Sequence, residues 1–187
     1  MTLPKLPVQP SATPWPTGSW SEGALACADQ AGFRRLVGEA FAAKSTPELG
    51  ETHALLVVQG GRITFERYGE GFTADSTHHS WSKAKSITHA LTGLLVKDGL
   101  VDVMAPADVP EWSQDSRKAI TLDQLLRMSS GLKFIEDYAP GGKPSDVIAM
   151  LFGEGKDDVA GYAASLPLEQ APGSYWSYAS GTTNIVS

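Results

Sequence analysis

The chain has 187 residues, 42% of them hydrophobic, which is enough for one domain with a substantial apolar core. Its net charge of −6 argues against nucleic acid or an anionic membrane as a partner, because binding to a polyanion requires a basic surface. Cys27 is the only cysteine, which excludes an internal disulfide and a cysteine-based metal cluster. A small soluble substrate is therefore the expected partner.

The N-terminal 28 residues are predicted to form an irregular arm rather than a domain. Their repeated prolines remove backbone donors and fix φ; they are Pro4, Pro7, Pro10, Pro14 and Pro16. The first 20 residues lack the basic start and continuous apolar run of a secretory signal, so we expect a cytoplasmic protein. No apolar stretch approaches the roughly 20 residues that span a bilayer. Residues 29–187 are expected to form a single domain.

A helix and a hairpin are predicted after the arm. Over residues 29–43, apolar side chains recur on one helical face; they are Phe33, Leu36, Val37, Ala40 and Phe41. The run 54–58 is continuously apolar, Gly60 and Gly61 suit a turn, and apolar and polar residues alternate from 62 to 66. We expect a β-hairpin within 54–69, with its first strand covered on both faces.

Helices dominate the remaining sequence. A wide apolar stripe predicts a helix over 82–98 that ends at Gly99. Thr121 and Gln124 have the spacing of a capping box, so a short helix is expected over 121–128. Two further short helices are expected, over 144–152 and 157–165. Residues 174–181 follow a Pro-Gly turn and are predicted to form a loop that exposes a tyrosine.

Ser82 and Lys85 are the first candidate catalytic residues, because one helical turn brings positions i and i+3 together. The lysine amine can then take the proton of the serine hydroxyl. Ser80 and Lys83 have the same spacing, so the pattern alone is ambiguous. Helical projection places Lys85 on the polar side and favours Ser82 with Lys85, but the first turn of a helix is too irregular for projection to decide.

Tyr178 is the third candidate. It lies in the loop after the Pro-Gly turn, where its hydroxyl can be exposed. A positive charge such as a lysine ammonium stabilises the phenolate form of a neighbouring tyrosine. Serine, lysine and tyrosine could thus form one unit for proton transfer.

The order of these motifs resembles the serine β-lactamase and penicillin-binding-protein superfamily, in its class C and esterase branch. The matching features are the hairpin, the SxxK tetrad at Ser82–Lys85, the Met128–Leu132 segment, and the turn leading to Tyr178. The chain looks most like 6-aminohexanoate-dimer hydrolases and related carboxylesterases, which the Glu136-Asp137-Tyr138 loop and Tyr178-Ala179-Ser180 also match. The resemblance covers roughly residues 50–187, and a small hydroxyl residue after the pair, here Ser86, supports Ser82 with Lys85.

This resemblance implies an α/β (α+β) fold of β-lactamase/transpeptidase type, with an antiparallel sheet flanked by helices and a helical subdomain. It also implies a serine hydrolase of linear amides or esters, without metal or cofactor. Ser82 would be the nucleophile, and Lys85 and Tyr178 would share the acid-base role in an order that stays open. The amide of Ser82, at a helix N-terminus, would form half of an oxyanion hole. Tyr138, Trp176 and Ser180 are candidate substrate contacts.

Two departures from the family pattern limit the activity that we expect of this chain. Ser180 stands where class C β-lactamases have asparagine, so strong β-lactamase activity is not expected. The third motif of the family, KTG or HxG on a later strand, is not found in this sequence. Lys97-Asp98-Gly99 resembles it only superficially, because it lies at a predicted helix end. We therefore expect an N-terminal piece of the fold, incomplete at the C-terminus, either truncated or completed by a second chain, and lacking full activity alone.

Other polar and aromatic residues near the motifs have simpler interpretations. His78 and His79 would point to opposite sides of an extended segment, which disfavours a shared metal. His89 is expected to be packed or hydrogen-bonded, and Asp157-Asp158 to begin a helix. Tyr175 and Trp176 suit a substrate cleft or a core equally well. The alternative to a hydrolase is a non-catalytic or truncated module of the same fold that binds a ligand or partner chain.

Overall fold

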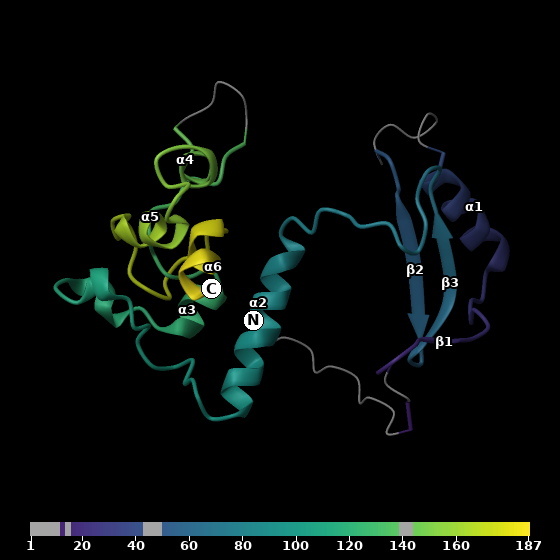
Figure 1. The fold of residues 1–187 in the computed structure, drawn as a ribbon, viewed down its shortest axis with the longest axis horizontal. Helices are drawn as coiled ribbons and strands as arrows, with labels where there is room; N and C mark the ends of the chain where they lie inside the picture. Colours follow the sequence, from purple (N-terminus) through teal and green to yellow (C-terminus); the bar gives the residue numbers. More distant parts are fainter. Residues whose placement is uncertain (1–11, 14–15, 43–49, 139–143) are drawn as a thin grey trace. The chain divides into compact units, whose positions relative to one another are not determined.

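The computed structural model describes residues 12–13, 16–42, 50–138 and 144–187. The chain divides into two compact units, Met1–His78 and His79–Ser187. The first unit holds a small sheet and one helix, and the second is mainly helical (Figure 1). All the residues predicted to be catalytic lie in the second unit.

The sheet of the first unit has three strands in the order β1-β3-β2. Strands β2 (Ala54–Gln59) and β3 (Arg62–Tyr68) pair antiparallel, which confirms the predicted hairpin. Gly60 and Gly61 connect them with φ of +57° and +73°, a conformation that residues with a side chain adopt at a cost. The two-residue strand β1 (Ser21–Glu22) pairs in parallel with β3 and lies within the segment expected to be irregular.

Helix α1 (Gln30–Ala40) packs on one face of this sheet. The carboxylate of Asp29 caps the helix by accepting a hydrogen bond from the Gly32 amide at 2.8 Å. The ring of Phe33 meets that of Phe65 edge-on at 5.0 Å. This confirms the predicted helix, although its last expected residue lies outside the described residues. The prediction that the first strand is covered on both faces is wrong, because Leu56 and Val58 of β2 are each 47% exposed.

The second unit contains the predicted helices, each within two residues of its expected ends. They are α2 (Lys83–Lys97), α3 (Leu122–Leu126), α4 (Asp146–Phe152) and α5 (Val159–Ser165). The side chains of Thr121 and Gln124 form the expected capping box of α3. Two 3₁₀ turns, η2 (Pro110–Trp112) and η3 (Ser116–Ala119), and helix α6 (Ser180–Val186) complete the unit. Because α6 begins at Ser180, the loop predicted over 174–181 ends two residues earlier than expected, at Ala179.

Two clusters of buried side chains form the core of this unit. One contains Trp112, Ile120, Leu125, Leu132 and Ala164, and the other contains Val147, Met150 and Ala163. The indole N–H of the fully buried Trp112 donates to the Ala164 carbonyl at 2.8 Å, so its polar atom is satisfied. Ile185 of α6 packs against both clusters. The core thus fixes the position of α6, whose first residues belong to the candidate site.

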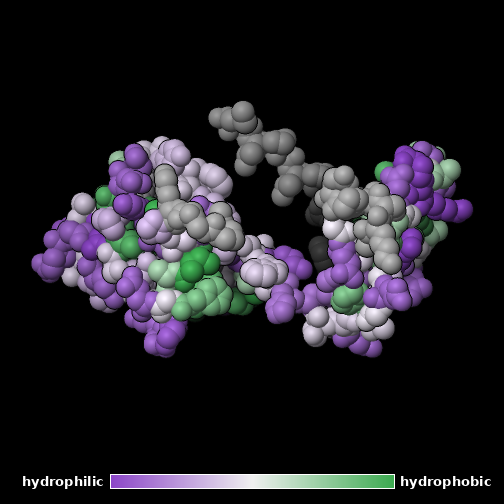
Figure 2. Space-filling model, turned by 90° about the horizontal axis from the view of Figure 1, so that it is seen from above, coloured by the Kyte–Doolittle hydropathy of each residue, from purple (hydrophilic) through white to green (hydrophobic). Residues whose placement is uncertain are grey.

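Hydrophobic side chains also reach the surface of the second unit (Figure 2). On α2, the apolar stripe that predicted the helix includes the exposed residues Ile87, Leu91 and Leu94. Among the described residues, none of the helices has both the length and the apolar character needed to cross a bilayer.

Candidate active site

The three predicted catalytic side chains lie together in the second unit. The Lys85 amine donates to the Ser82 hydroxyl oxygen at 3.2 Å, from one turn further along α2. The Tyr178 hydroxyl, 96 residues away in the sequence, donates to the same oxygen at 2.5 Å. Ser82 occupies the N-cap position of α2, but its side chain does not cap the helix. Its hydroxyl is therefore engaged with the lysine and the tyrosine.

The contacts of Lys85 favour one of the two SxxK pairs. Its amine donates to the Ser180 hydroxyl oxygen at 3.1 Å and lies 5.1 Å from the centre of the Tyr178 ring. In the other pair, the Ser80 hydroxyl donates to the carbonyl of Trp81 at 3.4 Å. The Lys83 backbone N–H donates to the Ser80 carbonyl at 3.0 Å, but in the part of the chain that the structure describes no hydrogen bond joins the Ser80 hydroxyl to the Lys83 amine. The geometry supports Ser82 with Lys85.

The backbone beside Ser82 adopts an unusual conformation. Trp81, directly before it, has φ of +43°, and Met128, directly before the Ser129-Ser130-Gly131 turn, has φ of +57°. Outside glycine, such conformations cost on the order of 1 kcal/mol or more and occur often at functional sites. Within the described ranges, the backbone N–H of Ser82 is paired with no acceptor. That amide is free to donate to a bound carbonyl oxygen.

Glu136 forms the other side of the site. One carboxylate oxygen accepts the Ser180 backbone N–H at 2.7 Å, and the other accepts the Ser180 hydroxyl at 2.6 Å. The Tyr138 hydroxyl also donates to Glu136, at 3.0 Å. Partial desolvation and the adjacent Glu136 carboxylate raise the pKa of Tyr138, so this hydroxyl keeps its proton at neutral pH. The sequence indicated Glu136 only as part of a matching loop, without a role.

Tight packing holds the start of α6, and with it Ser180, in place. Ala179, Ser180 and Thr182 are all at most 7% exposed. Gly181 has no room for a side chain, because a Cβ would lie 2.5 Å from the ring of Phe134. The Thr182 hydroxyl donates to the Ala179 carbonyl at 2.9 Å. Ser180 therefore has little freedom to move away from Lys85.

The turn at Met128–Gly131 holds the segment that carries Tyr178. The Met128 carbonyl accepts the Ser177 amide at 2.9 Å, and the Ser129 carbonyl accepts the Gly173 amide at 2.8 Å. Gly131 has φ of +80°, and a Cβ there would lie 2.2 Å from the Gln170 carbonyl oxygen. This turn was part of the predicted motif, and its observed contacts orient the segment before Tyr178.

The remaining candidate residues lie at the edge of the site or outside it. Tyr138 is 54% exposed, and Trp176 is 64% exposed, as is Tyr175 at 61%. The interpretation of Tyr175 and Trp176 as core residues is wrong, because both side chains are largely exposed. Ser180, expected as a substrate contact, is hydrogen-bonded to Lys85 and Glu136 instead.

His89 and Asp158 have the roles expected of them. The His89 ring nitrogen lies 3.0 Å from the Leu126 carbonyl, so it joins α2 to α3. His78 stacks on the ring of His53, with centroids 5.3 Å apart. Asp158 caps α5 by accepting the Gly161 amide at 2.8 Å.

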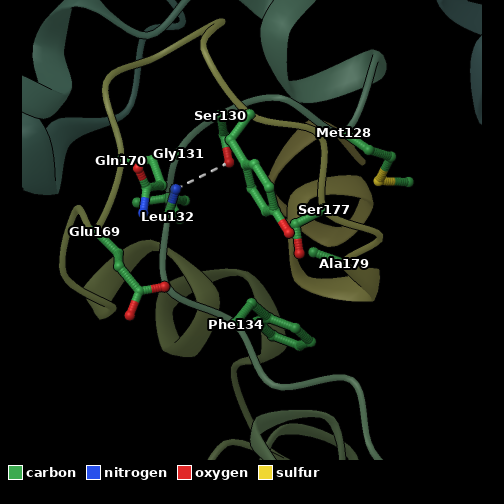
Figure 3. Close-up of a pocket in the computed structure, with 10 residues that line it drawn as sticks. Met128, Ser130, Gly131, Leu132, Phe134, Glu169, Gln170, Ser177 and Ala179 are labelled. Atoms are coloured by element: carbon green, nitrogen blue, oxygen red, sulfur yellow. Dashed lines mark hydrogen bonds between the residues drawn. The ribbon is translucent and has the colours of Figure 1, made fainter.

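A separate pocket lies beside the segment that carries Tyr178 (Figure 3). Ser177 and Ala179 contribute to its wall, as do Phe134 and Glu169. Ser130 also lines it, and the Ser130 hydroxyl oxygen accepts the Leu132 amide at 3.3 Å. Ser82, Lys85 and Tyr178 are not among its lining residues, so this pocket is distinct from the candidate site.

Comparisons with known proteins agree with the fold. The chain is similar to a solved structure described as "Putative 6-aminohexanoate-dimer hydrolase from Bacillus anthracis", with a TM-score of 0.66 and 23% identity over 89% of this chain. It is also similar to a "putative beta-lactamase from Bacteroides dorei DSM 17855", with a TM-score of 0.61 and 24% identity over 84% of this chain. The aligned regions make up 46% and 44% of those two structures.

No curated protein matched the sequence. Residues 41–187 match the family described as Beta-lactamase. This match includes most of the chain and every residue of the candidate site. Together with the β-lactamase-like fold, it shows that the chain belongs to the Beta-lactamase family.

Proposed function

We propose that this chain carries the acylation site of a serine hydrolase that acts on linear amides or esters. The observation that supports this most strongly is the position of the Ser82 hydroxyl oxygen, within hydrogen-bond distance of both the Lys85 amine and the Tyr178 hydroxyl. A serine hydroxyl is a weak nucleophile at neutral pH and needs an adjacent base. Here two groups capable of proton transfer contact it directly.

The proposed reaction has two stages. The Ser82 oxygen attacks the carbonyl carbon of the substrate, and its proton passes to Lys85 or Tyr178. The tetrahedral intermediate then collapses, and the same pair returns a proton to the leaving amine or alcohol. In the second stage a water molecule, deprotonated by this pair, attacks the acyl-enzyme and releases the acid and Ser82.

The start of α2 contributes to stabilising the negative charge. The Ser82 amide can donate to the developing oxyanion, and the N-terminal end of the helix dipole favours negative charge there. Loss of one such donor typically costs about 3 kcal/mol of transition-state stabilisation.

Substrate contacts are proposed at the exposed aromatic side chains. Tyr138 and Trp176 present ring surface to solvent and can contact an acyl or leaving group. Ser180 has no amide to offer a β-lactam side chain, and its hydroxyl already bonds Lys85 and Glu136. We therefore place linear amides and esters ahead of β-lactams as substrates.

Labelling with a fluorophosphonate probe tests this function. The probe forms a covalent bond to an activated serine, so the folded protein should be labelled and the Ser82→Ala variant should not. Ser80→Ala is the matched control and should be labelled normally, because the Ser80 hydroxyl bonds the Trp81 carbonyl and not the Lys83 amine. Absence of labelling in the folded wild-type protein would favour the alternative, a non-catalytic module that binds a ligand or partner.

A further inference from the structure

We infer that Glu136 is a positioning residue, which acts through Ser180 to orient the Lys85 amine toward Ser82. This inference rests on the proposed function. Glu136 contacts none of Ser82, Lys85 and Tyr178 through a hydrogen bond in the described part of the chain. Its effect on the reaction must therefore pass through the side chain that joins it to Lys85, and Ser180 is that side chain.

The direction of the hydrogen bonds follows from the chemistry of the groups. An ionised carboxylate can only accept hydrogen bonds. Ser180 has one hydroxyl proton, which it donates to Glu136 at 2.6 Å. The Ser180 oxygen therefore presents only lone pairs to Lys85 at 3.1 Å, so the lysine amine must be the donor there. Glu136 thus sets the polarity of the contact between Ser180 and Lys85.

This polarity fixes the orientation of the amine. With one N–H directed at Ser180, the Lys85 nitrogen directs another N–H at the Ser82 oxygen, 3.2 Å away. Glu136 also accepts the Ser180 backbone N–H at 2.7 Å, which holds the main chain from which that hydroxyl projects. Because Ser180 is 7% exposed, water has little access to replace either contact.

A second carboxylate in the same unit offers a comparison. Asp146 accepts the Ile135 backbone N–H at 2.7 Å and the Tyr162 hydroxyl at 3.3 Å. It resembles Glu136 in bonding one backbone amide and one tyrosine, but no hydrogen bond connects it to Lys85. A purely structural carboxylate in this unit should behave like Asp146.

Glu136→Gln tests the inference with little change in shape. Glu136 accepts the Ser180 amide and the Ser180 hydroxyl with different carboxylate oxygens, and a glutamine in the same position has an oxygen at only one of those two sites. Its NH₂ group would donate to the Ser180 oxygen and turn the hydroxyl proton toward Lys85. We expect the maximal rate of Ser82 phosphonylation by a fluorophosphonate to fall about tenfold, while the reversible affinity for the probe stays within about twofold.

Asp146→Asn and a double mutant provide the controls. Asp146→Asn should leave both labelling parameters unchanged. Ser180→Ala should lower the maximal rate as much as Glu136→Gln does, and adding Glu136→Gln to Ser180→Ala should lower it by no more than about a further twofold. Thermal unfolding of each variant identifies any that fails to fold.

Three results would overturn the inference. They are an unchanged maximal rate in Glu136→Gln, an unchanged maximal rate in Ser180→Ala, and a further fall of about tenfold when Glu136→Gln is added to Ser180→Ala. If Glu136→Gln does not fold, Ser180→Ala alone decides. Failure of the proposed function gives a different result, because the wild-type protein would then show no labelling that depends on Ser82.

Discussion

The two sides of the candidate site differ in their exposure and in what holds them. Ser82 is exposed at the start of α2, and its hydroxyl contacts only the lysine and the tyrosine in the described residues. Ser180 lies at the buried start of α6, where Glu136 holds both its backbone and its hydroxyl. The proposed nucleophile is thus exposed, while Ser180, which bonds its lysine, is shielded from water. Changes on the first side should affect chemistry far more than stability.

The largest effect is expected from Ser82→Ala, on the accessible side. Removal of the nucleophile should reduce hydrolysis of a p-nitrophenyl ester by on the order of 10⁶-fold, as loss of a catalytic serine does elsewhere. Stability should change little, because Ser82 does not cap α2. Steady-state rates and thermal unfolding measure the two effects. Turnover within tenfold of wild type would show that the exposed serine is not the reacting group.

Lys85→Ala should give the next largest effect, about 10²- to 10⁴-fold in the rate of acylation. The lysine contacts Ser82 from the same helix and links it to Ser180. Lys83→Ala is the matched control, since Lys83 is exposed and, in the described residues, its amine is not hydrogen-bonded to the Ser80 hydroxyl. Equal losses in the two variants, measured by single-turnover kinetics, would contradict the assignment of Lys85.

Tyr178→Phe removes the hydrogen bond from the tyrosine hydroxyl to Ser82 and should slow acylation by about 10²-fold. The phenylalanine ring can still lie beside the Lys85 amine, so packing is retained while the 2.5 Å hydrogen bond to Ser82 is lost. Circular dichroism measures whether the variant stays folded, and single-turnover kinetics measure the rate of acylation. A variant that unfolds but reacts normally when folded would assign Tyr178 a structural role.

Gly131→Ala, unlike the three variants above, should mainly lower the stability of the fold. Its Cβ would lie 2.2 Å from the Gln170 carbonyl oxygen, and its φ is +80°. We expect the free energy of unfolding to fall by about 2 kcal/mol. Gly93→Ala, within α2 and with no atom near the new Cβ, should instead raise it by up to about 1 kcal/mol. Denaturant titration that ranked Gly93→Ala as the more damaging change would contradict this view of the turn.

The elements of the fold could be predicted where the pattern is local. Apolar spacing located α1 and α2, Gly60-Gly61 located the hairpin turn, and Thr121 with Gln124 located α3. These signals depend on neighbours within a few residues, so they survive without knowledge of the tertiary structure. The parallel pairing of β1 with β3 and the exposure of Leu56 could not be predicted, because both depend on contacts between segments far apart in the sequence.

The candidate site could be predicted only in part, where its residues lie close together in the sequence or match a family motif. Ser82 and Lys85 are one turn apart, and their spacing together with the family motif indicated them. Tyr178 was indicated by its place in the loop after the Pro-Gly turn and by the order of the motifs. The bond between Glu136 and Ser180 joins residues 44 positions apart, and no periodicity reports such a contact. Ser180 was accordingly expected to meet substrate, whereas it bonds Lys85.

Peptide mapping of the fluorophosphonate adduct by mass spectrometry tests the central claim most directly. The account predicts a single adduct on the Ser82 hydroxyl, absent after prior denaturation, because the lysine and tyrosine must contact that oxygen to activate it. An adduct on Ser80 or on another serine in the folded protein, with Ser82 unmodified, would contradict it.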